Sequence, residues 1–241
     1  MGLNLRAVML TDLGLARDNN EDSGYAGHRL LVVADGVGGQ PAGEVASALV
    51  VSELVPLDEG PARDDPLGAL RDAVEAANQR IAEAGESDPA QGGMATTLTA
   101  LLLSGDKLAL LHVGDSRAYR LRDGELRQLT VDDTYVQWLV ERGMLAPEEA
   151  RNHPQRSVVV QVVQGDDLQA QGEVLEPSPG DRYLLCSDGL SDMVADEAIA
   201  ETLQAHADLK ECAERLIALA LSAGGPDNIT VALADLADVA E

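Results

Sequence analysis

The chain has 241 residues, 45% of them hydrophobic, and its 17 basic and 42 acidic residues give a formal net charge of −25. An acidic surface repels phosphate backbones and anionic lipid headgroups, so we expect neither nucleic acid nor a membrane as a partner. The charge is otherwise typical of a soluble surface, and bound divalent cations could offset part of it. With no Phe, one Trp and four Tyr, the core must be aliphatic, and the length suits a single domain, 1–241.

The two cysteines, Cys186 and Cys212, predict neither a disulfide framework nor a zinc site, which favours a reducing cytoplasm. The N-terminus lacks the basic-then-apolar pattern of a signal peptide. The apolar stretch from Ala95 to Val113 is interrupted by a turn at 104–107, so we expect no membrane-spanning segment.

Hydrophobic patterning predicts the elements of the N-terminal half in chain order. They are a strand at 5–10, a polar loop at 11–22, a strand at 30–34, a glycine-rich turn at 36–39, a helix at 42–54, a loop at 58–66 and a helix at 67–84.

The C-terminal half is expected to begin with an antiparallel meander. Its predicted strands are 96–103, 107–113, 118–121, 158–163, 183–187 and 229–233, and its predicted helices are 134–142, 147–152, 196–206 and 209–222. This mixed order favours an α+β fold, in which two antiparallel sheets pack face to face with helices on both outer faces, rather than a regular βαβ winding.

Three acids stand where apolar runs begin or end. Asp35-Gly36 follows the run 30–34, Asp188-Gly189 follows 183–187, and Asp227 precedes 229–233. Acids at the ends of buried strands can meet at one sheet edge, where they repel one another unless a cation lies among them. Carboxylates and backbone carbonyls are the oxygen ligands that Mg²⁺ and Mn²⁺ prefer.

Two such cations would activate a water molecule for attack on phosphorus, and an arginine would then hold the phosphate oxygens. Arg17, near Glu21 and Asp22, is the candidate. Each signal alone has a structural explanation, since Asp-Gly also forms hairpin turns, Asp115 could cap a turn with Arg117 as surface partner, and Pro226-Asp227 could start one. Their joint occurrence in this order favours the metal site.

Seven motifs in this order resemble the metal-dependent Ser/Thr protein phosphatases of the PPM (type 2C) family in their compact bacterial form. The matching runs are 14–22, 33–39, 43–47, 93–97, 112–117, 185–190 and 225–230. The resemblance implies a central β-sandwich with helices on both outer faces and a flap subdomain near 130–165. It also implies two Mn²⁺ or Mg²⁺ ions per subunit and a third, weaker site.

The resemblance assigns a role to each candidate site residue. Asp35 would bridge two ions, the Gly36 carbonyl would bind one of them, and Asp188 and Asp227 would bind the other. Asp115 would form the third site with Asp188, and Glu21 would act through a metal-bound water with Asp22 behind it. Arg17 would grip the substrate phosphate, while Asn228 and Thr97 would orient their neighbours.

The implied reaction is direct attack of metal-bound hydroxide on a phospho-Ser or phospho-Thr protein, reversing a partner Ser/Thr kinase. Family members often carry a histidine where Val37 and Gln40 stand here, so a metal-bound water is the substitute general acid. His112 is expected to be structural, and His153, in the flap region, could contact substrate. A monomer is expected.

Other chemistries fit less well. A cysteine-dependent phosphatase needs an arginine-closed phosphate loop, which does not follow Cys186, and neither a Walker loop nor a Rossmann fingerprint is present. The alternative is a catalytically weak relative that acts as a phosphoprotein-binding or regulatory module. Such proteins usually lose metal acids, whereas Asp35, Asp115, Asp188 and Asp227 are all present.

Overall fold

The computed structural model describes residues 3–37, 42–150 and 153–238, and within them two five-stranded antiparallel sheets pack face to face. The first sheet has the order β1 (Leu3–Asp12), β10 (Ile229–Asp238), β9 (Arg182–Cys186), β6 (Arg117–Arg122) and β7 (Glu125–Gln128). The second has the order β2 (Asp22–Ala26), β3 (Leu30–Asp35), β4 (Leu98–Ser104), β5 (Lys107–Val113) and β8 (Gln171–Leu175).

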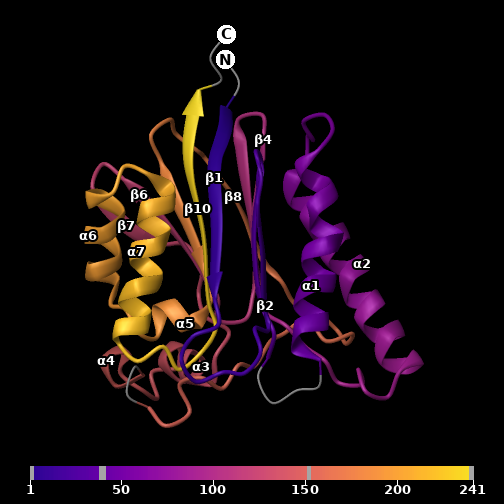
Figure 1. The fold of residues 1–241 in the computed structure, drawn as a ribbon. Helices are drawn as coiled ribbons and strands as arrows, with labels where there is room; N and C mark the ends of the chain where they lie inside the picture. The colour runs from indigo at the N-terminus through magenta and orange to yellow at the C-terminus, as the bar shows by residue number, and fades with distance from the viewer. Residues whose placement is uncertain (1–2, 38–41, 151–152, 239–241) are drawn as a thin grey trace.

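Helices cover both outer faces of this sandwich, as Figure 1 shows. The pair α1 (Gly43–Leu54) and α2 (Pro66–Ser87) lies on the second sheet, and α6 (Asp196–Ala205) and α7 (Leu209–Ser222) lie on the first. The remaining helices are short: η1 (Val55–Asp58), α3 (Tyr135–Glu141), α4 (Pro147–Ala150) and α5 (Asp188–Ser191). This arrangement confirms the predicted α+β sandwich.

Strand β3 shows why continuous apolar runs belong in this fold. Its side chains alternate between two apolar layers: Leu30, Val32 and Ala34 pack under α1 and α2, whereas Leu31 and Val33 pack between the sheets. All five are fully buried. Burying a side chain the size of Val or Leu contributes about 1.5–3 kcal/mol, so both faces of the strand stabilise the sandwich and fix the position of Asp35 at its end.

The helices begin where the sequence supplies a cap. The Asp65 side chain accepts a hydrogen bond from the Gly68 N–H at the start of α2, and Pro66 occupies the first helical position. Asp208 caps α7 in the same way by accepting from the Glu211 N–H. The buried residues of α2 then recur at helical spacing toward the sheet: Leu70, Val74, Ala77, Ile81.

The predicted strand 158–163 is wrong. Only isolated bridges occur there, from Val159 to Thr134 and from Val163 to Thr96, and Val158 and Val160 are 44% and 49% exposed. The strand that pairs with β5 is instead β8, a polar edge strand with no apolar run to reveal it. Strand β2 was not predicted either, and residues 38–41 of the expected turn, together with 151 and 152, lie outside the described part.

No helix among the described residues is long and apolar enough to cross a membrane.

Candidate active site

The acids singled out from the sequence lie at the end of the sandwich opposite the chain termini. Asp35 is the last residue of β3, Asp188 opens α5 just beyond β9, and Asp227 lies two residues before β10. Asp22 begins β2 directly opposite Asp35 in the β2–β3 pair. The strand ends therefore bring acids from both sheets to one edge.

These carboxyls strongly influence one another. Burial raises the pKa of Asp35 well above its usual range, and the charges of Asp22, Asp188, Asp115 and Asp227 raise it further. The pKa of Asp188 is also raised well above its usual range, by burial and then by Asp115 and Asp192. Burial raises the pKa of Asp115 to about 7, and the charges of Asp132 and then Asp192 add to this effect. The cluster therefore resists full ionisation unless positive charge is supplied.

Asp22 is a buried member of this group that has one carboxylate oxygen without a hydrogen-bond partner among the described residues. Ser187 Oγ donates to its Oδ2 at 2.8 Å, whereas its buried Oδ1 has no hydrogen-bond partner among the described residues. Burial raises its pKa, against the hydrogen bonds from Thr230 and Ser187. A buried, unpartnered carboxylate oxygen is costly and fits a site that a cation or its water completes.

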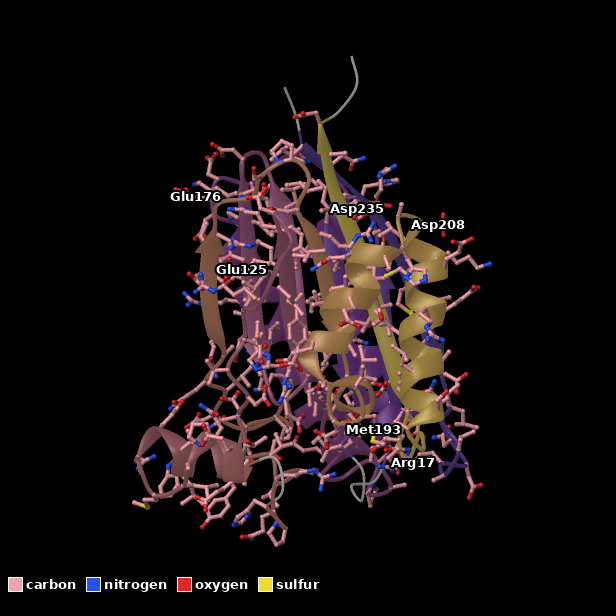
Figure 2. All side chains as sticks on the ribbon, turned by 90° about the vertical axis from the view of Figure 1, so that its left-hand side faces the viewer. Arg17, Glu125, Glu176, Met193, Asp208 and Asp235 are labelled. Atoms are coloured by element: carbon pink, nitrogen blue, oxygen red, sulfur yellow. The ribbon has the colours of Figure 1, made fainter. Side chains whose placement is uncertain are left out.

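Arg17 supplies the positive charge at the rim of the cluster. Its Nη2 donates to Asp227 Oδ2 at 2.7 Å, and its side chain stays 38% exposed. This hydrogen bond raises the pKa of Arg17, with further contributions from the charges of Glu21 and Asp35. Figure 2 shows Arg17 at the end of the molecule away from the termini.

Gly36 stands where the backbone approaches its neighbours too closely for a side chain. A Cβ at this position would lie 2.6 Å from the carbonyl carbon and oxygen of Gly43 and 2.8 Å from the Glu21 carbonyl oxygen. The Gly36 N–H donates to that Glu21 oxygen at 3.1 Å. The absence of a side chain thus lets the segment after Asp35 pack against both the 21–22 segment and the start of α1.

The side chains of Thr97 and Asn228 form hydrogen bonds with backbone groups around the site. Thr97 Oγ1 accepts from the Asp35 N–H at 3.0 Å. Asn228 Oδ1 accepts from the Glu21 N–H at 2.8 Å, and its Nδ2 donates to the carbonyls of Leu13 and Asn19. Asn228 thereby ties the loop that carries Arg17 to the start of β10.

A cleft of about 580 Å³ opens beside Asp188 and Asp115 and extends under segment 130–165. Sequence reasoning missed two acids that line it, Asp132 and Asp192. Arg117, which the structural alternative for this motif placed at the surface beside Asp115, binds Asp132 through Nε at 2.9 Å and Nη2 at 2.6 Å. The four-residue spacing from Asp188 to Asp192 could have placed the second of these acids beside the cluster.

In the ranges that the structure describes, no three Asp, Glu, His or Cys side chains converge closely enough to hold a metal ion. The donor chemistry nevertheless suits one, because the clustered groups are hard oxygen donors with raised pKa values and one of them, Asp22, has an unsatisfied oxygen. Asp227 is held by Arg17 in this arrangement.

Comparison with known proteins defines the class. The family model described as protein phosphatase 2C matches residues 16–220. The serine/threonine protein phosphatase PstP of Mycobacterium tuberculosis is 54% identical over 98% of this chain and 46% of its own length. The protein phosphatase PhpP of Streptococcus pneumoniae is 36% identical over 95% of this chain and 96% of its own.

A solved structure of the catalytic domain of serine threonine protein phosphatase PstP in complex with 2 manganese ions superposes with a TM-score of 0.92. It is 52% identical and covers 98% of this chain and 100% of its own. This chain belongs to the protein phosphatase 2C family. It spans about half, 46%, of the length of the curated PstP relative that it matches.

Proposed function

We propose that this chain is a metal-dependent phosphoprotein phosphatase that hydrolyses phospho-Ser and phospho-Thr on proteins. The observation that carries the proposal is the cluster of mutually repelling acids at one sandwich edge with Arg17 at its rim. Family membership and the manganese-bound PstP structure support it. The cofactor would be a pair of Mn²⁺ or Mg²⁺ ions, which supply an activated water and offset the negative charge of the reacting phosphate.

We assign the ions to acids of the sheet edge whose charges raise the pKa of Asp35. Asp35, with the Gly36 carbonyl, would hold both ions, and Asp188 and Asp227 would complete the pair. The charge of Asp115 raises the pKa of Asp188, and these two carboxyls would form a third, weaker site. Glu21 would act through a water molecule in the site, with Asp22 behind it, whose buried Oδ1 has no hydrogen-bond partner among the described residues.

Arg17 would bind the substrate phosphate. Its guanidinium is a rigid donor fork, it is 38% exposed, and it stands next to the acids proposed to hold the ions. Thr97 would orient Asp35, and Asn228 would orient Glu21, through the backbone hydrogen bonds that each accepts. Val37 offers no proton donor at the position where a histidine is common in the family, and Gln40 lies outside the described residues.

Segment 130–165 would act as a flap that contacts the phosphoprotein, since several of its residues, including Thr134, Gln137 and Arg156, line the cleft beside Asp188 and Asp115. His153, in this segment, is a candidate for substrate contact. A cognate Ser/Thr kinase, a cytoplasmic location and a monomeric state complete the proposal. Both cysteines are free and buried, which agrees with a reducing compartment.

The test is release of phosphate from a phosphothreonine peptide with Mn²⁺, repeated with excess EDTA and with the Asp188→Asn variant. Release that needs Mn²⁺ and is lost in the variant supports the enzyme. Peptide binding without release, at any Mn²⁺ or Mg²⁺ concentration, favours the binding module instead.

A further inference from the structure

His112, on β5, is a buried ionisable residue that the proposed function does not use. It is 1% exposed, and its cross-strand neighbours are Thr99 on β4 and Gln171 on β8. Its Nε2 is buried without a hydrogen-bond partner among the described residues. A buried acceptor without a partner costs about 1–3 kcal/mol, so the position of this ring requires an explanation.

The hydrogen bonds of Thr99 determine the tautomer of His112. Thr99 Oγ1 lies 3.0 Å from the Ser116 carbonyl oxygen and 2.9 Å from His112 Nδ1. A carbonyl can only accept, and a hydroxyl has one hydrogen, so the Thr99 hydroxyl donates to Ser116. Both bonds are made only if His112 carries its proton on Nδ1 and donates it to Thr99. The lone pair is then on Nε2, the atom without a partner.

The same series continues to Asp35. Ser116 Oγ lies 2.8 Å from Thr97 Oγ1, which in turn accepts the Asp35 N–H at 3.0 Å. The four side chains in this series are at most 2% exposed: His112, Thr99, Ser116, Thr97. Hydrogen bonds in such a buried setting are strong and hold their groups in one geometry.

Burial is the largest influence on the ring and lowers the pKa of His112, which favours the neutral form. The charges of Asp133 and Asp132 and the backbone of Val131 and Gly114 act in the opposite direction. Asp133 is already engaged by the Gly114 N–H at 3.0 Å and by Gln171 Nε2 at 2.7 Å. A neutral ring with one fixed tautomer can serve as a constant donor to Thr99.

We propose that His112 is a positioning residue that holds Asp35 in place through Thr99, Ser116 and Thr97. The inference rests on the proposed function only in taking Asp35 as an ion ligand. Groups that orient metal ligands from behind affect metal affinity or activity by about 10- to 100-fold when they are removed. His112 therefore contributes to the site without touching substrate or ion.

The experiment compares His112→Leu with His112→Asn, whose side-chain amide can replace the donor to Thr99. Ser104→Ala is the matched control, because Ser104 is a buried hydroxyl at the opposite end of β4 that binds Arg63. The first readout is the Asp35 backbone amide in metal-free protein, by NMR chemical shift and hydrogen exchange. The second is Mn²⁺ affinity by calorimetry.

We expect His112→Leu to shift the Asp35 amide, speed its exchange and weaken Mn²⁺ binding by about 10- to 100-fold. His112→Asn should restore both readouts, and Ser104→Ala should leave them unchanged. If His112→Leu does not fold, Thr99→Val interrupts the same series and should give the same result. An Asp35 amide that responds to His112→Leu no more than to Ser104→Ala overturns the inference. Failure of the wild-type protein to bind Mn²⁺ would instead overturn the proposed function, while the amide readout still decides the role of His112.

Discussion

Arg17 donates a 2.7 Å hydrogen bond to Asp227, so the residue proposed to bind phosphate is paired with one proposed to bind a metal ion. The two lie 210 residues apart in the chain and meet because the 13–20 loop is fastened to the start of β10 by Asn228. Binding of a metal ion to Asp227, or of phosphate to Arg17, would each draw one partner away from this pair.

Arg17→Ala should raise KM for a phosphothreonine peptide by about 10- to 100-fold, since a hydrogen bond to a charged group contributes about 1.5–3 kcal/mol. Mn²⁺ binding should persist, because the substitution releases Asp227 from its pair. Arg6→Ala is the control, since Arg6 pairs with Asp235 at 3.4 Å on an exposed surface. Steady-state kinetics and calorimetry measure the two effects, and an unaltered KM counts against the phosphate role.

Asp188→Asn should abolish turnover while the metal-free protein keeps its fold and gains stability. Burial and neighbouring acids raise the pKa of Asp188 well above its usual range, so removing its charge relieves repulsion. Circular dichroism and urea unfolding in EDTA, beside a phosphate-release assay, test both parts. Turnover at the wild-type rate with saturating Mn²⁺ would contradict the assignment.

Asp181→Asn should have the opposite effect on stability. Although burial opposes it, hydrogen bonds from Arg122, the Ser178 N–H and Tyr183 lower the pKa of Asp181. The Arg122 side chain is 32% exposed, so the charge left behind stays solvated, and losing a hydrogen bond to a charged group should cost about 1.5–3 kcal/mol and lower the midpoint of urea unfolding. Turnover per folded molecule should not change, because Asp181 lies at the start of β9, outside the acid cluster. A selective loss of kcat would show that the site extends further than proposed.

Gly36→Ala should impair Mn²⁺ binding and stability together. The added Cβ would lie 2.6 Å from Gly43 backbone atoms, so the segment after Asp35 must shift. Gly85→Ala is the control: its Cβ meets nothing closer than 3.5 Å, and alanine in place of glycine within a helix stabilises by about 0.5–1 kcal/mol. Calorimetry and thermal unfolding should separate the two variants. Tight Mn²⁺ binding by Gly36→Ala would contradict the role in metal binding that is proposed for Gly36.

The metal-free protein should lose stability as pH rises from about 4 to about 7. Burial and the charges of Asp132 and Asp192 raise the pKa of Asp115 to about 7, so over this range the folded state retains a proton that the unfolded state has released. The contribution of Asp115 is about 4 kcal/mol, since one pKa unit corresponds to about 1.4 kcal/mol. Asp115→Asn should flatten the profile of urea midpoints measured in EDTA. A variant profile as steep as the wild type would argue against a raised pKa.

The sequence predicted best those elements whose side chains are buried on both faces. The runs that precede Asp35 and Asp188 are apolar throughout, so they could only be buried strands. Helix α7 has its expected bounds because its apolar residues recur at helical spacing. The sequence pattern did not predict strand β8, because its first four residues are exposed and mostly polar. The valines at 158–163 have the apolar pattern of a strand, but the segment forms only isolated bridges, and Val158 and Val160 are exposed. The apolar pattern alone therefore predicted a strand that the tertiary structure does not contain.

The candidate site residues could be predicted where sequence motifs contain them. The hydrogen bonds between residues far apart in the chain could not be predicted in this way. Nothing local to Thr99 or Ser116 indicates that their hydroxyl and carbonyl groups connect His112 to Asp35. The pairing of Arg117 with Asp132 is equally a product of tertiary structure, because it depends on where segment 130–165 crosses the cleft.

Metal-dependent hydrolysis is tested by phosphate release from a phosphothreonine peptide, titrated with Mn²⁺ and then with EDTA, on wild-type and Asp188→Asn protein in parallel. We expect release that saturates with Mn²⁺, stops with EDTA and is absent from the variant. Release by the wild-type protein that EDTA does not affect, or equal release by the variant, would contradict it.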